Sequence, residues 1–267
     1  MSNIKNRPIG IFDSGVGGLT VLKEIRKIFP REDIVYFGDT ARVPYGNKSK
    51  STIVKFSTEN VLFLLRKRVK MVVIACNTSS ALALDYLKSV FSIPILGVIE
   101  AGVKKALEVS SQGRIGVIGT KSTIASGSYE KTILKINKQS FVYAQSCPLF
   151  VPLVEEGILG GKIVKEAMAM YLGDFRKQKI DTIILGCTHY PLLKKEIGRF
   201  LKDVHVVDSA QAVAHHTKSV LSLNDLFNSQ RKRGGEEFYV SDESEGFIKL
   251  AKLFLNRKIT KPRIVNV

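Results

Sequence analysis

The fold of this chain is decided by two similar stretches, Val72-Val-Ile-Ala-Cys76-Asn-Thr78 and Ile183-Ile-Leu-Gly-Cys187-Thr188. In each, an unbroken run of apolar residues leads to a cysteine, and a threonine follows within two residues. A short apolar run without alternating polar positions is typical of a parallel strand that is buried on both faces of its sheet. Each stretch therefore predicts a buried parallel strand with a cysteine close after its end.

Strands and amphipathic helices alternate around these stretches. Apolar residues recur at helical spacing in the helices and form short continuous runs in the strands. Such alternation indicates βαβ units around parallel sheets. The expected elements are strands over residues 9–12, 34–37, 71–75, 115–118, 141–145, 182–185 and 237–240, and helices over 19–29, 51–67, 123–136, 161–177 and 247–255.

Each half of the chain shows the same order of elements and ends in one of the two cysteines. This weak internal duplication predicts an α/β protein of two pseudo-symmetric domains, each with a mostly parallel sheet flanked by helices. The junction between the domains is expected near residues 97–102, and a polar linker that ends in two glycines is expected over 228–235.

Three candidate functional side chains come directly after predicted strands: Asp13, Cys76 and Cys187. Ligands of open parallel sheets bind beyond the carboxyl ends of the strands. If the two halves face each other, both cysteines reach one interdomain cleft from opposite sides. Inversion at a carbon atom needs this arrangement, because one group removes a proton from one face while a second group delivers a proton to the other. The sequence therefore favours an amino-acid racemase with two opposed thiols.

A free thiol has a pKa near 8.5, and a helix N-terminus or a nearby cation lowers it. Both cysteines precede a predicted helix, so we expect the free N–H groups of each helix to stabilise a thiolate. His189 could supply a proton or a positive charge. Cys147 is followed by Pro148 and has no counterpart in the first half, which favours a structural role. The other histidines, expected on the surface or in packing, are His205, His215 and His216.

A glycine-rich turn over residues 13–18, Asp-Ser-Gly-Val-Gly-Gly, follows the first strand. It lacks the third glycine of a dinucleotide-binding loop, where Thr20 stands, and it has no G-K-[ST] motif. Two interpretations of Asp13 stay open: it orients or deprotonates a group in the cleft, or it caps the following helix. The free N–H groups of the turn are suited to a carboxylate.

The chain has 267 residues and a net charge of +17. This excess, which includes Arg231-Lys232-Arg233, fits a solvated lysine-rich surface that also steers small acidic substrates. Binding of nucleic acid is the alternative, although no motif for it accompanies the charge. Three cysteines without zinc-type spacing argue against a disulfide framework and a metal site. No apolar stretch reaches the roughly 18 residues of a membrane span, so a cytoplasmic protein is expected.

Five blocks together resemble glutamate racemase, of the aspartate/glutamate racemase superfamily, and they run in family order from residue 9 to about 209. The last block favours the glutamate enzyme; aspartate and hydantoin racemases on the same scaffold are the alternative. The blocks are Ile-Phe-Asp13-Ser14-Gly-Val-Gly-Gly, Gly38-Asp39-Thr40-Ala-Arg-Val-Pro44-Tyr45-Gly46, Ala-Cys76-Asn77-Thr78, Cys147-Pro-Leu-Phe-Val-Pro-Leu-Val-Glu155-Glu156-Gly157 and Gly186-Cys187-Thr188-His189-Tyr-Pro191-Leu-Leu.

The resemblance implies cofactor-independent racemisation of L-glutamate to D-glutamate, which supplies peptidoglycan and so cell wall biogenesis and cell shape. It implies a discontinuous first domain, residues 1–98 plus 209–267, and a second domain over 99–208, with the active site in the cleft between them. A homodimer is expected, and some members have a side role against DNA gyrase. The short segment before the first strand argues against the precursor-dependent activation of some Gram-negative members.

The resemblance also implies residue roles. The family's catalytic thiols fall on Cys76, which acts on D-glutamate, and on Cys187, which acts on L-glutamate. The flanking residues favour Asp13 as the helper of Cys76 and His189 as the helper of Cys187. The resemblance places a further assisting group on one glutamate of the adjacent pair, which the sequence does not distinguish, and we choose Glu155 over Glu156. The expected substrate contacts are Asp13, Ser14, Pro44, Tyr45, Gly46, Asn77, Thr78, Thr120, Thr123, Thr188 and His189.

Overall fold

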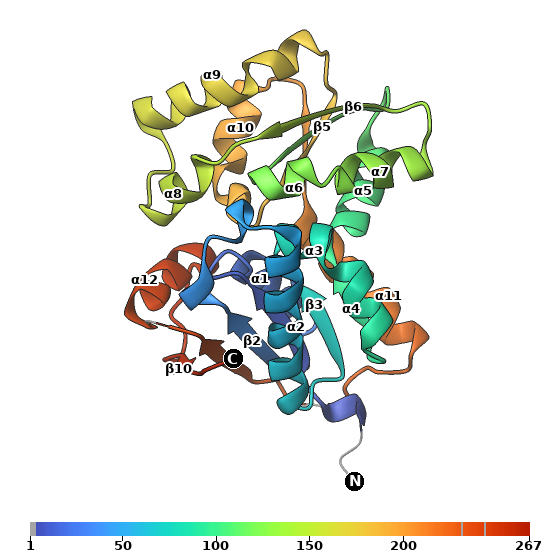
Figure 1. Ribbon diagram of the computed structural model, residues 1–267, viewed down its shortest axis with the longest axis vertical. Helices are drawn as coiled ribbons and strands as arrows, with labels where there is room; N and C mark the ends of the chain where they lie inside the picture. The colour runs from blue at the N-terminus through green and yellow to red at the C-terminus, as the bar shows by residue number, and fades with distance from the viewer. Residues whose placement is uncertain (1–3, 231, 243) are drawn as a thin grey trace.

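Two parallel sheets organise the chain, and they lie one above the other in Figure 1. The computed structural model describes residues 4–230, 232–242 and 244–267. One sheet has six strands in the order β10-β9-β2-β1-β3-β4, and the other has four in the order β6-β5-β7-β8. Every strand pair in both sheets is parallel. The predicted α/β class with two helix-flanked parallel sheets is confirmed.

The six-stranded sheet carries the N-terminal and C-terminal parts of the chain. Its strands are β1 (Ile9–Asp13), β2 (Ile34–Gly38), β3 (Met71–Ile74), β4 (Ile95–Gly97), β9 (Glu236–Val240) and β10 (Arg263–Ile264). The helices around it are η1 (Ile4–Asn6), α1 (Leu19–Ile28), η2 (Thr40–Arg42), η3 (Tyr45–Asn47), α2 (Lys50–Arg66), α3 (Asn77–Leu82), α4 (Leu84–Val90), α11 (Ser209–Leu223) and α12 (Ser244–Leu255).

The four-stranded sheet carries the middle of the chain. Its strands are β5 (Arg114–Gly119), β6 (Phe141–Ser146), β7 (Thr182–Gly186) and β8 (His205–Asp208). The helices around it are α5 (Val98–Val109), α6 (Lys121–Ala125), α7 (Ser128–Ile136), α8 (Phe150–Glu155), α9 (Gly161–Lys177), η4 (Tyr190–Leu193) and α10 (Lys194–Phe200). None of the described helices is long and apolar enough to cross a membrane.

The internal duplication is visible in the strand order. The order β2-β1-β3-β4 in one sheet corresponds to β6-β5-β7-β8 in the other. The two apolar stretches form β3 and β7, and every residue of both strands is buried. Because β3 and β7 hold equivalent inner positions, Cys76 and Cys187 come after equivalent strands of the two sheets.

The structure differs from the sequence prediction at several elements. The helix expected over 123–136 is two helices, α6 and α7, because Gly127 adopts a left-handed φ of 64° between them. The unpredicted strands are short or partly exposed: β4 has three residues, β10 has two, and β8 is buried only at Val207. The unpredicted helices α5 and α11 directly follow β4 and β8, so no loop marks the expected junction.

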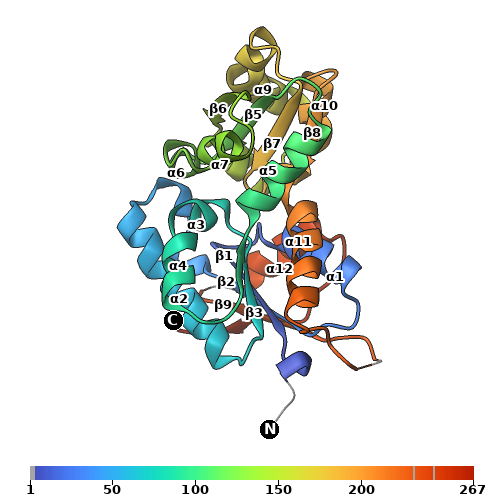
Figure 2. The ribbon, with the colours of Figure 1, turned by 90° about the vertical axis from the view of Figure 1, so that its right-hand side faces the viewer.

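Helices α5 and α11 connect the two sheets and pack against each other (Figure 2). The contact is tight, because a Cβ atom on Gly102 would lie 2.6 Å from the Ser209 hydroxyl oxygen. Strands β9 and β10 return to the first sheet after α11. These observations support our proposal of a discontinuous first domain, residues 1–98 plus 209–267, around a second domain over 99–208.

A buried arginine joins this returning segment to the first helix. Arg26 of α1 donates from Nε to Glu236 Oε1 at 2.8 Å and from its terminal nitrogens to the carbonyls of Gly235 and Glu32, each at 2.7 Å. Gly234 packs against the Glu32 carbonyl group that accepts from Arg26, since a Cβ on Gly234 would lie 2.0 Å from that oxygen. The described residues of the predicted linker over 228–235 form no helix or strand, and Arg231 lies outside the described residues.

Replacement of this arginine should destabilise the fold. Arg26→Met removes the ion pair with Glu236 Oε1 and the hydrogen bonds to four carbonyl groups, and breaking a buried ion pair costs about 3–5 kcal/mol. The matched control Lys27→Met removes an exposed ion pair to Glu24, which is worth less than about 1 kcal/mol. Urea denaturation measures both changes in the free energy of unfolding. Equal losses in the two variants would contradict the assignment.

Candidate active site

A cavity of about 360 Å³ lies between the two sheets, at the carboxyl ends of their strands. Two structural units contribute to its wall: the first unit is the six-stranded sheet with its helices, and the second is the four-stranded sheet with its helices. The lining includes Cys76 after β3 of the first unit and Cys187 after β7 of the second. The two thiols predicted from the sequence are therefore in one cavity. The lining residues are Ser14, Val43, Pro44, Tyr45, Gly46, Asn47, Cys76, Asn77, Thr78, Thr120, Lys121, Pro148, Val151, Pro152, Glu155, Cys187, Thr188 and His189.

Nearly all residues expected from the sequence are in this lining, and two lie just behind it. Asp13 is fully buried beneath the turn that carries Ser14. Thr123 is also buried, and its hydroxyl contacts that of Thr78 at 3.2 Å. Any influence of Asp13 or Thr123 on a ligand in this conformation must pass through the neighbouring groups.

Cys187 stands at one end of a chain of three polar groups. Its sulfur lies 3.9 Å from Nδ1 of His189, and Nε2 of that histidine lies 2.9 Å from Oε1 of Glu155. The His189 ring also packs edge-on against Phe254 of α12, with ring centroids 5.4 Å apart. The contacts orient the imidazole between a thiol and a carboxylate, the arrangement of an acid/base pair with an orienting third group.

The His189 imidazole holds its proton strongly in this setting. Burial alone would lower its pKa, but the hydrogen bonds and charges of Cys187 and Glu155 outweigh burial and raise the pKa to about 10. His189 is therefore an imidazolium at neutral pH, and its positive charge lies beside the Cys187 sulfur.

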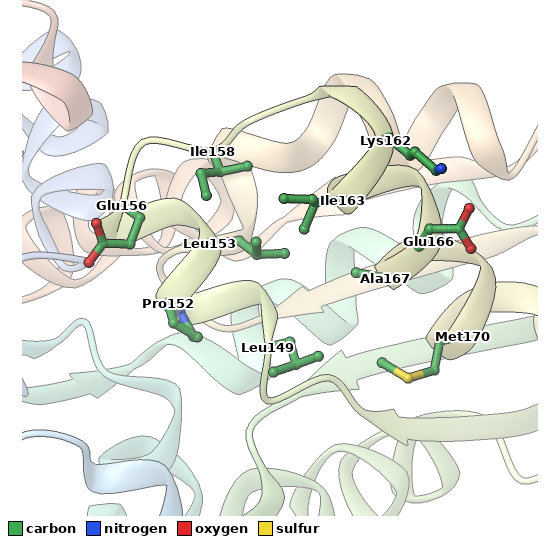
Figure 3. Close-up of a pocket in the computed structure, with 10 residues that line it drawn as sticks. All are labelled: Leu149, Pro152, Leu153, Glu156, Ile158, Lys162, Ile163, Glu166, Ala167 and Met170. Carbon is green, nitrogen blue, oxygen red and sulfur yellow. The ribbon is translucent and has the colours of Figure 1, made fainter.

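The two adjacent glutamates face different surroundings. Glu155, the last residue of α8, lines the cavity and contacts His189. Glu156 instead lines a separate apolar groove on the outer side of α8 and α9, together with Leu153 and Ile158 (Figure 3). Only Glu155 of this pair is placed to assist His189.

Cys76 has a different environment from Cys187. It is the N-cap residue of α3, as the sequence predicted, but burial and the nearby charge of Asp13 raise the pKa of its thiol to about 11. The expected stabilisation of a thiolate by the helix N-terminus is therefore outweighed, and the Cys76 thiol keeps its proton at neutral pH. Cys187 also precedes a helix, because the 3₁₀ helix η4 begins at Tyr190 and continues directly into α10.

Asp13 is held by the glycine-rich turn. Its Oδ2 accepts the Gly15 N–H at 3.0 Å, and its Oδ1 lies 3.5 Å from the Thr188 hydroxyl. Helix α1 begins at Leu19 after Gly18, and Gly18 is among the residues whose backbone N–H groups hydrogen-bond to Asp13. Burial raises the Asp13 pKa, against the opposing effects of the His189 charge and the backbone N–H groups of the turn.

Glycine is required in this turn because other chain segments approach closely. A Cβ on Gly17 would lie 2.3 Å from the Thr188 hydroxyl oxygen, and one on Gly18 would lie 2.5 Å from the Asp13 Cβ. The turn can therefore bring Asp13 and Ser14 beneath the cavity only without side chains at these two positions.

The loop that carries Tyr45 is anchored on both sides. The Tyr45 hydroxyl donates to Asp39 and accepts a hydrogen bond from Asn60 Nδ2 at 3.1 Å, so its polar end is engaged within the first unit. Across the cleft, the Ser122 hydroxyl of α6 donates to the Gly46 carbonyl at 2.8 Å. The part of this loop that remains for a ligand is its backbone and the Tyr45 ring.

Sequence reasoning missed some of the lining. Lys121 directly follows Thr120 after β5, so the rule that ligands bind beyond strand ends could have found it. Among the described residues, no group of three or more histidine, cysteine or acidic side chains could hold a metal ion. The residues that the sequence analysis did not select are Val43, Asn47, Lys121, Pro148, Val151 and Pro152.

Comparison with known proteins identifies the family. The model of the Asp/Glu/Hydantoin racemase family matches residues 9–217. The chain belongs to this family. It is 52% identical to the glutamate racemase of Aquifex aeolicus (strain VF5) over 258 residues, which cover 97% of each chain. The recognised resemblance to glutamate racemases, and with it the assignment as an isomerase, is confirmed.

Two solved structures of the family share the two-unit fold. The glutamate racemase of Francisella tularensis, described in complex with D-glutamate, superposes with a TM-score of 0.93 at 42% identity over 98% of both chains. The glutamate racemase of Thermus thermophilus, in complex with beta-chloro-D-alanine, gives a TM-score of 0.90 at 41% identity, again over 98% of both chains. The small ligands of these two structures and the cavity volume of about 360 Å³ both indicate a small-molecule substrate.

The raised pKa of His189 predicts a proton that persists at alkaline pH. NMR of the ring protons should show an imidazolium at pH 8 that is absent in His189→Gln and titrates near pH 10. Because the folded pKa lies above the ordinary value of 6.5, this proton stabilises the fold fully below pH 6.5, and the contribution is lost as pH rises through about 10. A His189 ring that titrates near pH 6.5 would refute the assignment.

The two glutamates form a matched pair for a second prediction. Glu155→Gln replaces the carboxylate beside the His189 imidazolium with a neutral amide. The charged hydrogen bond that is lost is worth about 1.5–3 kcal/mol, so racemisation should slow ~10- to 100-fold. Glu156→Gln should leave the rate within about twofold, because that side chain lines the outer groove. Circular dichroism of glutamate follows both rates. A larger loss in the Glu156 variant would reverse the assignment.

Proposed function

We propose that this protein interconverts L- and D-glutamate, with Cys76 and Cys187 as acid/base groups on opposite faces of the α-carbon. The observation that carries the proposal is the single cavity that both thiols line from equivalent strand ends of two pseudo-symmetric sheets. Support comes from relatives named glutamate racemase and from the Francisella tularensis structure with D-glutamate.

In the proposed direction from L- to D-glutamate, Cys187 acts as the base and Cys76 as the acid. The Cys187 thiolate, beside the His189 imidazolium, takes the α-proton and becomes a thiol. The electron pair of the broken C–H bond stays on the substrate, spread over the α-carbon and its carboxylate. Cys76, which is protonated because its pKa is raised to about 11, then gives its S–H proton to the opposite face and becomes a thiolate. D-glutamate follows the same steps in reverse.

Hydroxyl and amide groups bind the two substrate carboxylates in this proposal. Thr78 and Thr120 approach from different units, and their hydroxyl oxygens lie 3.0 Å apart. Buried Thr123 completes a triangle with them, at 3.2 and 2.9 Å. The Thr78 and Thr120 hydroxyls can rotate to donate to a carboxylate oxygen, and Thr123 acts from behind the lining through its contacts with them. Lys121 at the cavity and the net charge of +17 favour entry of an anionic substrate.

The proposed substrate contacts in the rest of the lining are Ser14, Pro44, Tyr45, Gly46, Asn77, Thr188 and His189. Asp13 acts from behind the lining in this proposal, as the buried charge beside Cys76.

The wider role follows the family. We propose that D-glutamate made in the cytoplasm supplies peptidoglycan and that the protein acts as a homodimer. A nucleic-acid interaction stays a secondary prediction that rests on the net charge of +17, and a gyrase interaction is one that rests on the family resemblance.

Replacement of either thiol tests the mechanism. Cys76→Ser and Cys187→Ser should each slow racemisation by ~10²- to 10⁴-fold, the usual contribution of a general acid or base. Circular dichroism of purified protein with D- or L-glutamate, without added pyridoxal phosphate, measures the rate. Cys147→Ser is the control, because that buried thiol is absent from the cavity lining. Full activity in both test variants would refute the two-thiol mechanism, and activity on aspartate alone would refute the substrate.

A further inference from the structure

A buried tyrosine outside the cavity lining contacts one of the proposed substrate groups. Tyr129 of α7 is 3% exposed, and its hydroxyl lies 2.6 Å from Oδ1 of Asn77, the first residue of α3. The same hydroxyl lies 3.4 Å from Oγ of Ser209, where α11 begins. Asn77 lines the cavity and Tyr129 does not. The tyrosine can therefore affect a ligand only through its neighbours.

The contact fixes which end of the Asn77 amide faces the tyrosine. A separation of 2.6 Å is within the range of an O–H···O bond and shorter than the range of an N–H···O bond. Burial raises the pKa of the Tyr129 hydroxyl, so it keeps its proton and donates it. The Asn77 carbonyl oxygen is the acceptor, and the two hydrogens of Nδ2 are left for another partner.

The orientation matters because the expected ligand is a dicarboxylate. An amide that presents Nδ2 donates to a carboxylate oxygen, whereas a flipped amide presents its own oxygen and repels it. The two orientations have the same shape, so packing alone selects poorly between them, and a hydrogen-bond partner must decide.

We propose that Tyr129 is a positioning residue for substrate binding, which holds the Asn77 amide with its N–H₂ group toward the carboxylate of glutamate. The inference rests on the proposed function. Since Tyr129 belongs to the second unit and Asn77 to the first, the amide is held in this orientation only while α7 lies against α3. Carboxylate binding is thereby coupled to the contact between the two units.

A double-mutant cycle tests this role. Tyr129→Phe should raise the KM for glutamate about tenfold, the effect of one hydrogen bond, and change kcat by less than about threefold. In the Asn77→Ala background the same replacement should have no further effect, because the group through which it acts is gone. Tyr190→Phe is the control: Tyr190 is also fully buried, but its hydroxyl donates to the Cys147 carbonyl at 2.8 Å and touches no proposed substrate group.

Calorimetric titration with D-glutamate gives a Kd for each variant independently of turnover. A Tyr129→Phe effect that persists in the Asn77→Ala background, or one no larger than that of Tyr190→Phe, would overturn the inference. A wild-type protein that binds D-glutamate without racemising it would refute the proposed function, while the Kd cycle still decides the role of Tyr129. A wild-type protein that does not bind glutamate would overturn both.

Discussion

The meeting of two equivalent sheet edges at one cavity is the constraint on which the rest of the structure depends. The order β2-β1-β3-β4 is repeated as β6-β5-β7-β8, and the inner strands β3 and β7 are each followed by a cysteine. One carbon can be approached from both faces only if two chain segments reach it from opposite sides. The paired helices α5 and α11 connect the two sheets, and Arg26 fixes the return of β9 to the six-stranded sheet.

The duplication places two thiols at equivalent positions, but their surroundings differ. Cys187 has an imidazolium beside it, supported by Glu155. Cys76 has a buried carboxylate nearby, and its pKa is raised to about 11. A two-base reaction needs one thiolate and one thiol at the start of each turnover, and two identical environments would favour the same state in both. In the proposed reaction, Asp13 near Cys76 and His189 beside Cys187 give the two thiols the different surroundings that an acid and a base need.

The sequence predicted the features that depend on local pattern. The apolar runs before Cys76 and Cys187 located β3 and β7, and the strand-end rule located the two thiols of the cavity, while the resemblance to glutamate racemases supplied most of its other lining residues. Features decided by tertiary contact were missed: the break at Gly127, the protonated Cys76 and the donor at Tyr129. Glu155 could be separated from Glu156 only by geometry, since adjacent identical residues carry the same local signal.

The central claim is that two different groups move the proton on the two faces of the α-carbon. Racemisation of L-glutamate in ²H₂O, stopped at low conversion and analysed by mass spectrometry after chiral separation, tests it most directly. With two thiols, the newly formed D-glutamate carries deuterium at Cα, because the opposite thiol delivers a solvent-derived proton, and the remaining L-glutamate stays unlabelled. D-glutamate that keeps the original hydrogen, or deuterium that appears equally in both enantiomers, would show that one base serves both faces and would contradict the account.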